Sequence, residues 1–92
     1  MSVKIRFFAR FRELLGSESI AEPAAGITLA SLVAEVARKN KDGYEAIFDE
    51  HGAFREFVIL MRNGKRVETP DAAGIVVADG DEIAVFPPVA GG

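Results

Sequence analysis

The chain has 92 residues, the usual size of a single domain, and its formal net charge at neutral pH is −3. Apolar residues make up 49% and charged residues 27% of it, which is typical of a globular protein and excludes a disordered one. The negative charge argues against general nucleic-acid binding, and no apolar run approaches the roughly 20 residues of a membrane span. Because Met1 leads straight into a strand-like segment, we expect a cytoplasmic protein with neither nucleic-acid nor membrane partners.

The residue types that most often carry metal and nucleophilic chemistry are almost absent. There is no cysteine, which excludes disulfides, thiolate zinc sites and a cysteine nucleophile. His51 is the sole histidine, so catalytic triads and multi-histidine metal sites are excluded as well. We therefore predict no metal site, no bound cofactor and no enzyme activity of the chain alone.

The first predicted elements are a strand, a short helix and a second strand. Residues 3–8 alternate apolar and basic side chains up to Phe7, as a half-buried strand does. Residues 9–15 then carry apolar side chains at helical spacing, and Gly16 is suited to end that helix. Residues 17–22 give a weaker strand signal, which Pro23 and Gly26 close.

The clearest helix of the chain follows Thr28, a suitable N-cap. Its apolar residues recur at helical spacing, which predicts one buried face formed by Leu29, Leu32, Val33, Val36 and Ala37. We expect this helix to end near Asn40 and residues 44–48 to form one further helical turn. His51 is expected in a loop.

The second half of the chain reads as strands and turns. The apolar run at residues 57–61 predicts a buried central strand, without indicating whether Leu60 or the pair Ile59 and Met61 is exposed. Asn63-Gly64 is a strong hairpin signal, and residues 65–68 would form the returning strand.

The last part of the chain is predicted to be irregular over residues 69–78 and then to form a final strand at residues 82–86. Pro87-Pro88 ends that strand, since proline cannot donate to a strand ladder. The acidic residues of the intervening segment lack the further ligands of a calcium loop, so Asp79-Gly80-Asp81 is expected to be a turn.

Strand pairs on either side of one good amphipathic helix predict an α+β fold with a mixed sheet packed on that helix. The β-grasp is the natural candidate, with the first and last strands as parallel neighbours at the centre. Periodicity alone supports the class but does not select this topology. We expect residues 1–88 to form the domain and residues 89–92 a flexible tail.

The chain closes on Gly91-Gly92, a pair that chance gives about one chain in two hundred. A frayed end without function is the plain alternative. Glycines have no Cβ and keep a tail thin, whereas the fixed φ of Pro87 and Pro88 would stiffen its base and aim it outward.

Four segments together resemble the MoaD/ThiS family of ubiquitin-like sulfur carriers. They are Phe7-Phe8-Ala9-Arg10-Phe11-Arg12-Glu13-Leu14-Leu15-Gly16, Arg62-Asn63-Gly64, Asp79-Gly80-Asp81-Glu82 and Phe86-Pro87-Pro88-Val89-Ala90-Gly91-Gly92. They occur in family order, and the double proline favours the branch of the molybdopterin synthase small subunit over the thiamine branch.

The resemblance implies chemistry at the Gly92 carboxylate. An adenylating enzyme of the ubiquitin-activating type (MoeB/ThiF-like) would use ATP to form an acyl-adenylate there, and a sulfur donor such as a cysteine desulfurase would convert it to a thiocarboxylate. The tail, with Gly91 beside the reacting residue, would then insert into a MoaE-like large subunit of molybdopterin synthase and give sulfur to a pterin precursor.

Two other uses of the same end group stay open, namely conjugation of Gly92 to lysines of target proteins and sulfur delivery to tRNA. A plain β-grasp interaction module with an inert tail is the last alternative.

Candidate partner-binding residues lie at the two ends of the resemblance. Phe8 and Phe86 are expected to face outward as paired aromatics, as interface cores favour, although Phe8 could instead turn under the short helix into the core. Arg10 and Arg12 lie within the family-like segment and are candidates for an interface. The tail residues Pro87, Pro88, Val89 and Ala90 complete the set. Residues 42–56 are longer than in short family members, either for partner specificity or as a tolerated insertion.

Overall fold

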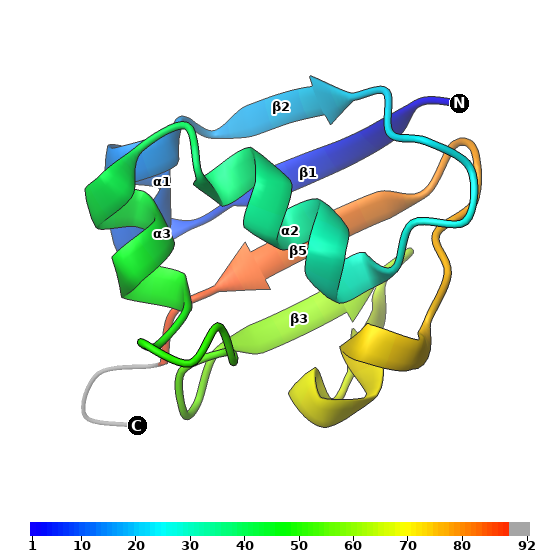
Figure 1. The fold of residues 1–92 in the computed structure, drawn as a ribbon. Helices are drawn as coiled ribbons and strands as arrows, with labels where there is room; N and C mark the ends of the chain where they lie inside the picture. Colours follow the sequence, from blue (N-terminus) through cyan, green and yellow to red (C-terminus); the bar gives the residue numbers. More distant parts are fainter. Residues whose placement is uncertain (89–92) are drawn as a thin grey trace.

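The computed structural model describes residues 1–88, and the expectations for residues 89–92 lie outside the described part. A five-stranded sheet carries its helices on one face (Figure 1). In chain order the elements are β1 (Val3–Phe7), α1 (Ala9–Leu15), β2 (Glu18–Ala21), α2 (Leu29–Ala37), α3 (Lys41–Ile47), β3 (Ile59–Arg62), β4 (Lys65–Val67), the 3₁₀ helix η1 (Thr69–Gly74) and β5 (Glu82–Phe86). None of the helices within residues 1–88 is long and apolar enough to cross a membrane.

The sheet has the strand order β2-β1-β5-β3-β4, so the first and last strands are neighbours at its centre. β1 and β5 run parallel, with Ile5 opposite Ile83, and the other three pairs are antiparallel. This mixed sheet crossed by α2 confirms the predicted β-grasp topology. It also brings the end of β5 close to the start of α1, where Phe8 N–H donates to Val85 O.

Helix α2 forms as its sequence pattern predicts. The Thr28 hydroxyl oxygen accepts from Ser31 N–H at 3.2 Å, and all five predicted core residues of the helix are buried. The helix stops at Ala37, because Asn40 caps the following helix instead, accepting from Gly43 N–H at 3.1 Å. α3 therefore begins at Lys41 and not at Tyr44, which corrects the single turn predicted at residues 44–48.

The apolar run at residues 57–61 is only partly a strand, although that strand lies inside the sheet as predicted. β3 begins at Ile59 and lies between β5 and the edge strand β4. Phe57 stands before it, 69% exposed and with a left-handed φ of 69°, in a turn closed by Val58 N–H donating to Arg55 O. This turn lets Val58 point into the core, so the run does not extend as one straight strand.

The segments on either side of β4 differ in how well they match the predictions. Residues 69–78 were expected to be irregular, but their first part is the 3₁₀ helix η1, which has Pro70 in its first turn. The hairpin at Asn63-Gly64 is confirmed, and both residues have positive φ, 51° and 81°, as a two-residue turn between β3 and β4 requires.

The two faces of the sheet differ in cover. Val3, Ile5, Phe7, Leu60, Ile83 and Val85 are fully or almost fully buried on the side of α2. The alternate residues of the same strands point to the opposite face, which none of the helices in residues 1–88 covers (Figure 1). Leu60 thus faces the core, and Ile59 and Met61 lie half-buried on the uncovered face, which decides the question that alternation left open.

Candidate functional site

The uncovered face meets the C-terminal end of β5 at a pair of aromatic rings. Phe86 ends β5, and its ring stacks on that of Phe8, with centroids 4.3 Å apart and planes inclined by 12°. Arg6, two residues before Phe8, places its guanidinium carbon 5.2 Å from the centre of the Phe8 ring. Both rings are half-buried, so Phe8 lies on the outer side with Phe86 and does not join the core.

Around this pair the surface is hollowed into an apolar groove of about 900 Å³. We call it the exit groove, because Pro87 and Pro88, which follow β5, form part of its wall. Its other lining residues come from α1 and its N-cap, α3, the segment before β3, β3 and the end of β5: Phe8, Ala9, Arg10, Phe11, Ala46, Arg55, Glu56, Val58, Ile59, Met61 and Phe86. Pro87 is half-buried and Pro88 exposed. An apolar wall of this kind next to the chain exit can receive apolar side chains of another protein.

The predicted site residues are brought together only in part. Phe8, Arg10, Phe86, Pro87 and Pro88 line one groove, although almost 80 residues separate its two ends in sequence. Arg12 is exposed and does not contribute to the groove. The predicted site residues Val89, Ala90, Gly91 and Gly92 lie outside the described residues.

Sequence reasoning missed several groove residues. Ile59 and Met61 could have been found from the alternation of β3, had its register been known. Ala46 and Arg55 carried no local signal, because only the packing of α3 and the following loop brings them to this wall. Arg55 adds a second cation to the rim beside Arg10.

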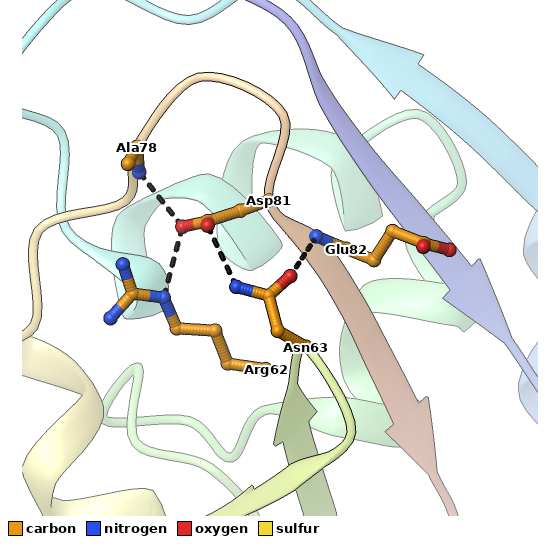
Figure 2. A network of polar contacts seen from close by, with 5 residues as sticks. All are labelled: Arg62, Asn63, Ala78, Asp81 and Glu82. Carbon is orange, nitrogen blue, oxygen red and sulfur yellow. Dashed lines mark hydrogen bonds and ion pairs between the residues drawn. The ribbon is translucent and has the colours of Figure 1, made fainter.

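At the opposite end of β5 a polar network fixes where the strand begins (Figure 2). Asp81 is 6% exposed, and its carboxylate accepts three hydrogen bonds of 2.8–2.9 Å, from Arg62 Nε, Asn63 Nδ2 and the Ala78 N–H. Asn63 in turn accepts from Glu82 N–H at 2.8 Å. The network ties the β3–β4 hairpin to the first residues of β5.

The charge of Asp81 is stabilised by this network. Burial alone would raise the pKa of its carboxyl group, but the hydrogen bonds from Ala78, Asn63 and Arg62 outweigh it and hold the pKa below its usual value of 3.8. The predicted turn at Asp79-Gly80-Asp81 is confirmed by the Asp81 N–H donating to Ala78 O and by φ 84° at Gly80. Within residues 1–88 no three histidine, aspartate or glutamate side chains are grouped so that they could hold a metal ion.

Comparison with known proteins decides the family. The family model described as the ThiS family matches residues 5–92, nearly the whole chain. The chain belongs to the ThiS family. Its motifs at Phe8, Asn63 and Phe86 thus lie within a match that includes both ends of the exit groove.

The relatives of this chain include proteins named as modifiers and proteins named as sulfur carriers. The chain is similar to small archaeal modifier protein 3 of Haloferax volcanii, 38% identical over 97 aligned positions that cover all of both chains. It is also similar to the molybdopterin synthase sulfur carrier subunit of Aedes aegypti, 34% identical with 98% of this chain and 88% of the relative covered. Among solved structures, SAMP1 from Haloferax volcanii covers all of both chains with a TM-score of 0.82 at 26% identity. The chain is thus a ubiquitin-like member of a sulfur-carrier family.

Proposed function

We propose that this chain carries sulfur as a thiocarboxylate on Gly92 and delivers it as the small subunit of a molybdopterin synthase-type complex. The observation that carries the proposal is the exit groove, where the aromatic pair and the two prolines adjoin the tail of a ThiS-family chain. The 34% identity to a molybdopterin synthase sulfur carrier subunit supports this choice of complex.

The proposed chemistry takes place at one carbonyl carbon. A carboxylate oxygen of Gly92 attacks the α-phosphorus of ATP, and pyrophosphate leaves, giving an acyl-adenylate. Sulfur at the level of hydrosulfide then attacks the carbonyl carbon, a C–S bond forms, and the C–O bond breaks as AMP leaves with the electron pair. We expect the acid and base groups for both steps, and the nucleotide site, to belong to its partners.

The partners would recognise the groove and the tail together. Phe8, Phe86 and Met61 offer the apolar contact. Two arginines, Arg10 and Arg55, outnumber the one acidic lining residue, Glu56, and this positive excess would steer an acidic edge of a partner. An adenylating enzyme would use this surface first, a sulfur donor would act on the adenylate, and the large subunit would then take the same place. Sequential use requires that each complex dissociates before the next one forms.

Conjugation of Gly92 to lysine amines of other proteins is a second candidate. The 38% identity over full length to small archaeal modifier protein 3 favours it. Both functions share the acyl-adenylate and differ only in the nucleophile that follows, sulfur in one case and an amine in the other. Sulfur delivery to tRNA would use the same thiocarboxylate.

The test uses the absence of cysteine, because only a thiocarboxylate gives this protein a thiol-like group. The untagged chain is co-expressed with the adenylating enzyme and sulfur donor of its source organism, treated with a thiol-selective alkylating reagent, and mapped by high-resolution mass spectrometry. We expect one adduct, on Gly92, and none in a control that lacks Gly92 but keeps its fold. Fragment mapping is needed since exchange of oxygen for sulfur is close in mass to oxidation of Met1 or Met61.

The other outcomes separate the candidates. Adenylation without any adduct, together with a ladder of covalent conjugates in extract of the source organism, would support the modifier and contradict sulfur carriage. Absence of adenylation would contradict both functions and leave an interaction module.

A further inference from the structure

The edge strand β2 presents unpaired backbone groups to solvent. Phe7 N–H donates to Ser17 O, and Ser19 and Ala21 lie opposite Ile5 and Val3, so the odd-numbered residues bond to β1. The N–H and C=O groups of Glu18 and Ile20 therefore point away from the sheet, and no other backbone group among residues 1–88 bonds to them. In Figure 1 β2 is the outermost strand on the side of the sheet away from β3.

The opposite edge differs in its chemistry. β4 has only three residues, and Lys65 and Arg66 are two of them, which is how natural edges avoid pairing with another strand. β2 contains no lysine, arginine or proline, and Ile20 is 57% exposed at its centre. Of the two edges, β2 is the one open to a further strand.

A shallow hollow of about 220 Å³ adjoins β2 on the side of the helices. Leu32 and Val36 of α2 form its apolar floor, with Ala21 on the strand side and Glu35 and Lys39 on its borders. Ser19 and Ala21, the two β2 residues on this face, have small side chains, and Lys39 Nζ donates to Ser19 Oγ at 3.0 Å, so the exposed Lys39 side chain would move aside for an added strand. A strand added beside β2 would thus find room for apolar side chains against α2.

We propose that β2 binds an extended peptide segment of another protein by strand addition, and that this segment has three consecutive apolar residues flanked by basic ones. Main-chain bonds to the outward groups of Glu18 and Ile20 would give affinity, and the side chains would give specificity. Two of the three apolar residues would lie on the helix face, beside Ser19 and Ala21. The central one would oppose Ile20.

Charge selects the flanking residues. Glu18, Ile20 and Glu22 occupy alternate positions and are all exposed. On the uncovered face, this edge of the sheet therefore presents an acidic, an apolar and an acidic side chain in turn. Glu18 has only a loose ion pair with Lys4, 3.9 Å long and largely exposed, and Glu22 has no ion-pair partner within residues 1–88. Basic side chains directly opposite these two would form favourable cross-strand pairs, whereas acidic ones would repel.

The experiment titrates the full chain, labelled with ¹⁵N, with a synthetic peptide of lysine, three valines and lysine, capped at both ends. We expect amide shifts concentrated in β2 and at Leu32 and Val36, and at least about tenfold weaker binding of the same peptide with glutamate in place of lysine. Shifts confined to the exit groove, or equal binding of the two peptides, would overturn the proposal.

A proline substitution isolates the backbone contribution. Ile20→Pro removes an N–H that points to solvent and leaves the β1 ladder intact, as edge strands tolerate. We expect it to weaken peptide binding about tenfold or more, while Ile20→Thr, which keeps the N–H, has a smaller effect. Arg66→Pro on β4 is the matched control and should leave affinity unchanged. If the free chain dimerises and Ile20→Pro dissolves the dimer, the occupant is a second copy and the proposal is wrong.

Discussion

At the scale of single residues, the structure separates groups that hold the fold from groups placed for contact. Asp81 is the one buried charged residue within residues 1–88. Its carboxylate accepts hydrogen bonds from Arg62, Asn63 and Ala78. Phe8 and Phe86 instead lie half-buried at the surface and stack on each other. An aspartate from a turn motif therefore has a structural role, and the aromatics beside the chain exit are available to partners.

Replacement of Asp81 by asparagine should destabilise the fold by roughly 1–3 kcal/mol near neutral pH, because an amide cannot accept all three hydrogen bonds or balance Arg62. Since the folded state lowers the pKa of Asp81, its contribution is full above the usual pKa of 3.8 and is lost as pH falls through the lower folded value. Urea unfolding at several pH values should therefore show the difference between wild type and Asp81→Asn shrinking in acid. The role of this network would be contradicted if the loss of stability in Asp81→Asn were constant with pH. It would also be contradicted if that loss were as small as the loss in Asp71→Asn, where the aspartate is exposed.

Phe86→Ala should weaken docking of the adenylating enzyme, because it removes one ring of the aromatic pair and leaves Phe8 without a stacking partner. The fold should be kept, because Phe86 is only half-buried and lies on the uncovered face. We expect kcat/KM for adenylation of Gly92 to fall at least about tenfold, the scale of a loss of 1.4 kcal/mol at an interface. Val76→Ala is the control, because Val76 is 53% exposed and does not line the exit groove. Equal rates for the two variants would remove the groove from the docking surface.

At the scale of elements, α3 shows how one side chain sets the position of a helix. Asn40 accepts from Gly43 N–H, and its own amide donates to Leu14 O at 3.0 Å, so the cap of α3 is tied to the end of α1. α1 and α3 therefore pack closely where Gly43 meets Leu15. This packing brings Ala46 to the exit groove.

Gly43→Val should loosen this contact. A Cβ at Gly43 would lie 2.6 Å from Leu15 Cγ, which forces the side chain or the helix to shift and costs about 2 kcal/mol of folding stability. Gly74→Val is the matched control, because a Cβ there meets nothing within 4 Å, and its effect should stay within about 0.5 kcal/mol. Thermal or urea unfolding measures both, and similar stabilities for the two variants would refute the close approach.

At the scale of the whole molecule, the parallel pair β1–β5 joins the two ends of the chain. β2 lies on the β1 side of this pair, β3 and β4 lie on the β5 side, and α2 covers its inner face (Figure 1). Asp81 lies just before β5, and Phe86, Pro87 and Pro88 lie at its other end, so one strand connects the polar network to the exit groove.

Ile83→Ala should destabilise the entire domain by about 3 kcal/mol, as removal of a fully buried isoleucine side chain leaves a cavity at the centre of the sheet. Because β1 and β5 form one unit, native-state hydrogen exchange should accelerate equally in the amides of both strands. Ile20→Ala on the exposed edge should change stability by less than about 0.5 kcal/mol. Faster exchange in β5 alone would show that the two strands open separately.

The sequence by itself determined the local elements and the family. The buried face of α2, the hairpin at Asn63-Gly64 and the alternation of β1 follow from periodicity and turn chemistry, which act between residues close in the chain. The four ordered segments between Phe7 and Gly92 indicated the MoaD/ThiS family, and the ThiS-family match over residues 5–92 confirmed it.

Only the tertiary structure decided which of these residues meet. The stacking of Phe8 on Phe86, the exposure of Phe57, the position of β3 beside an edge strand and the exclusion of Arg12 from the groove all depend on strand order and on turns far away in sequence. The bond from the Asn40 side chain, the N-cap of α3, to Leu14 O likewise joins segments that are distant in sequence. Such contacts form between segments that no local pattern relates, because packing of the whole core determines which faces and ends lie together.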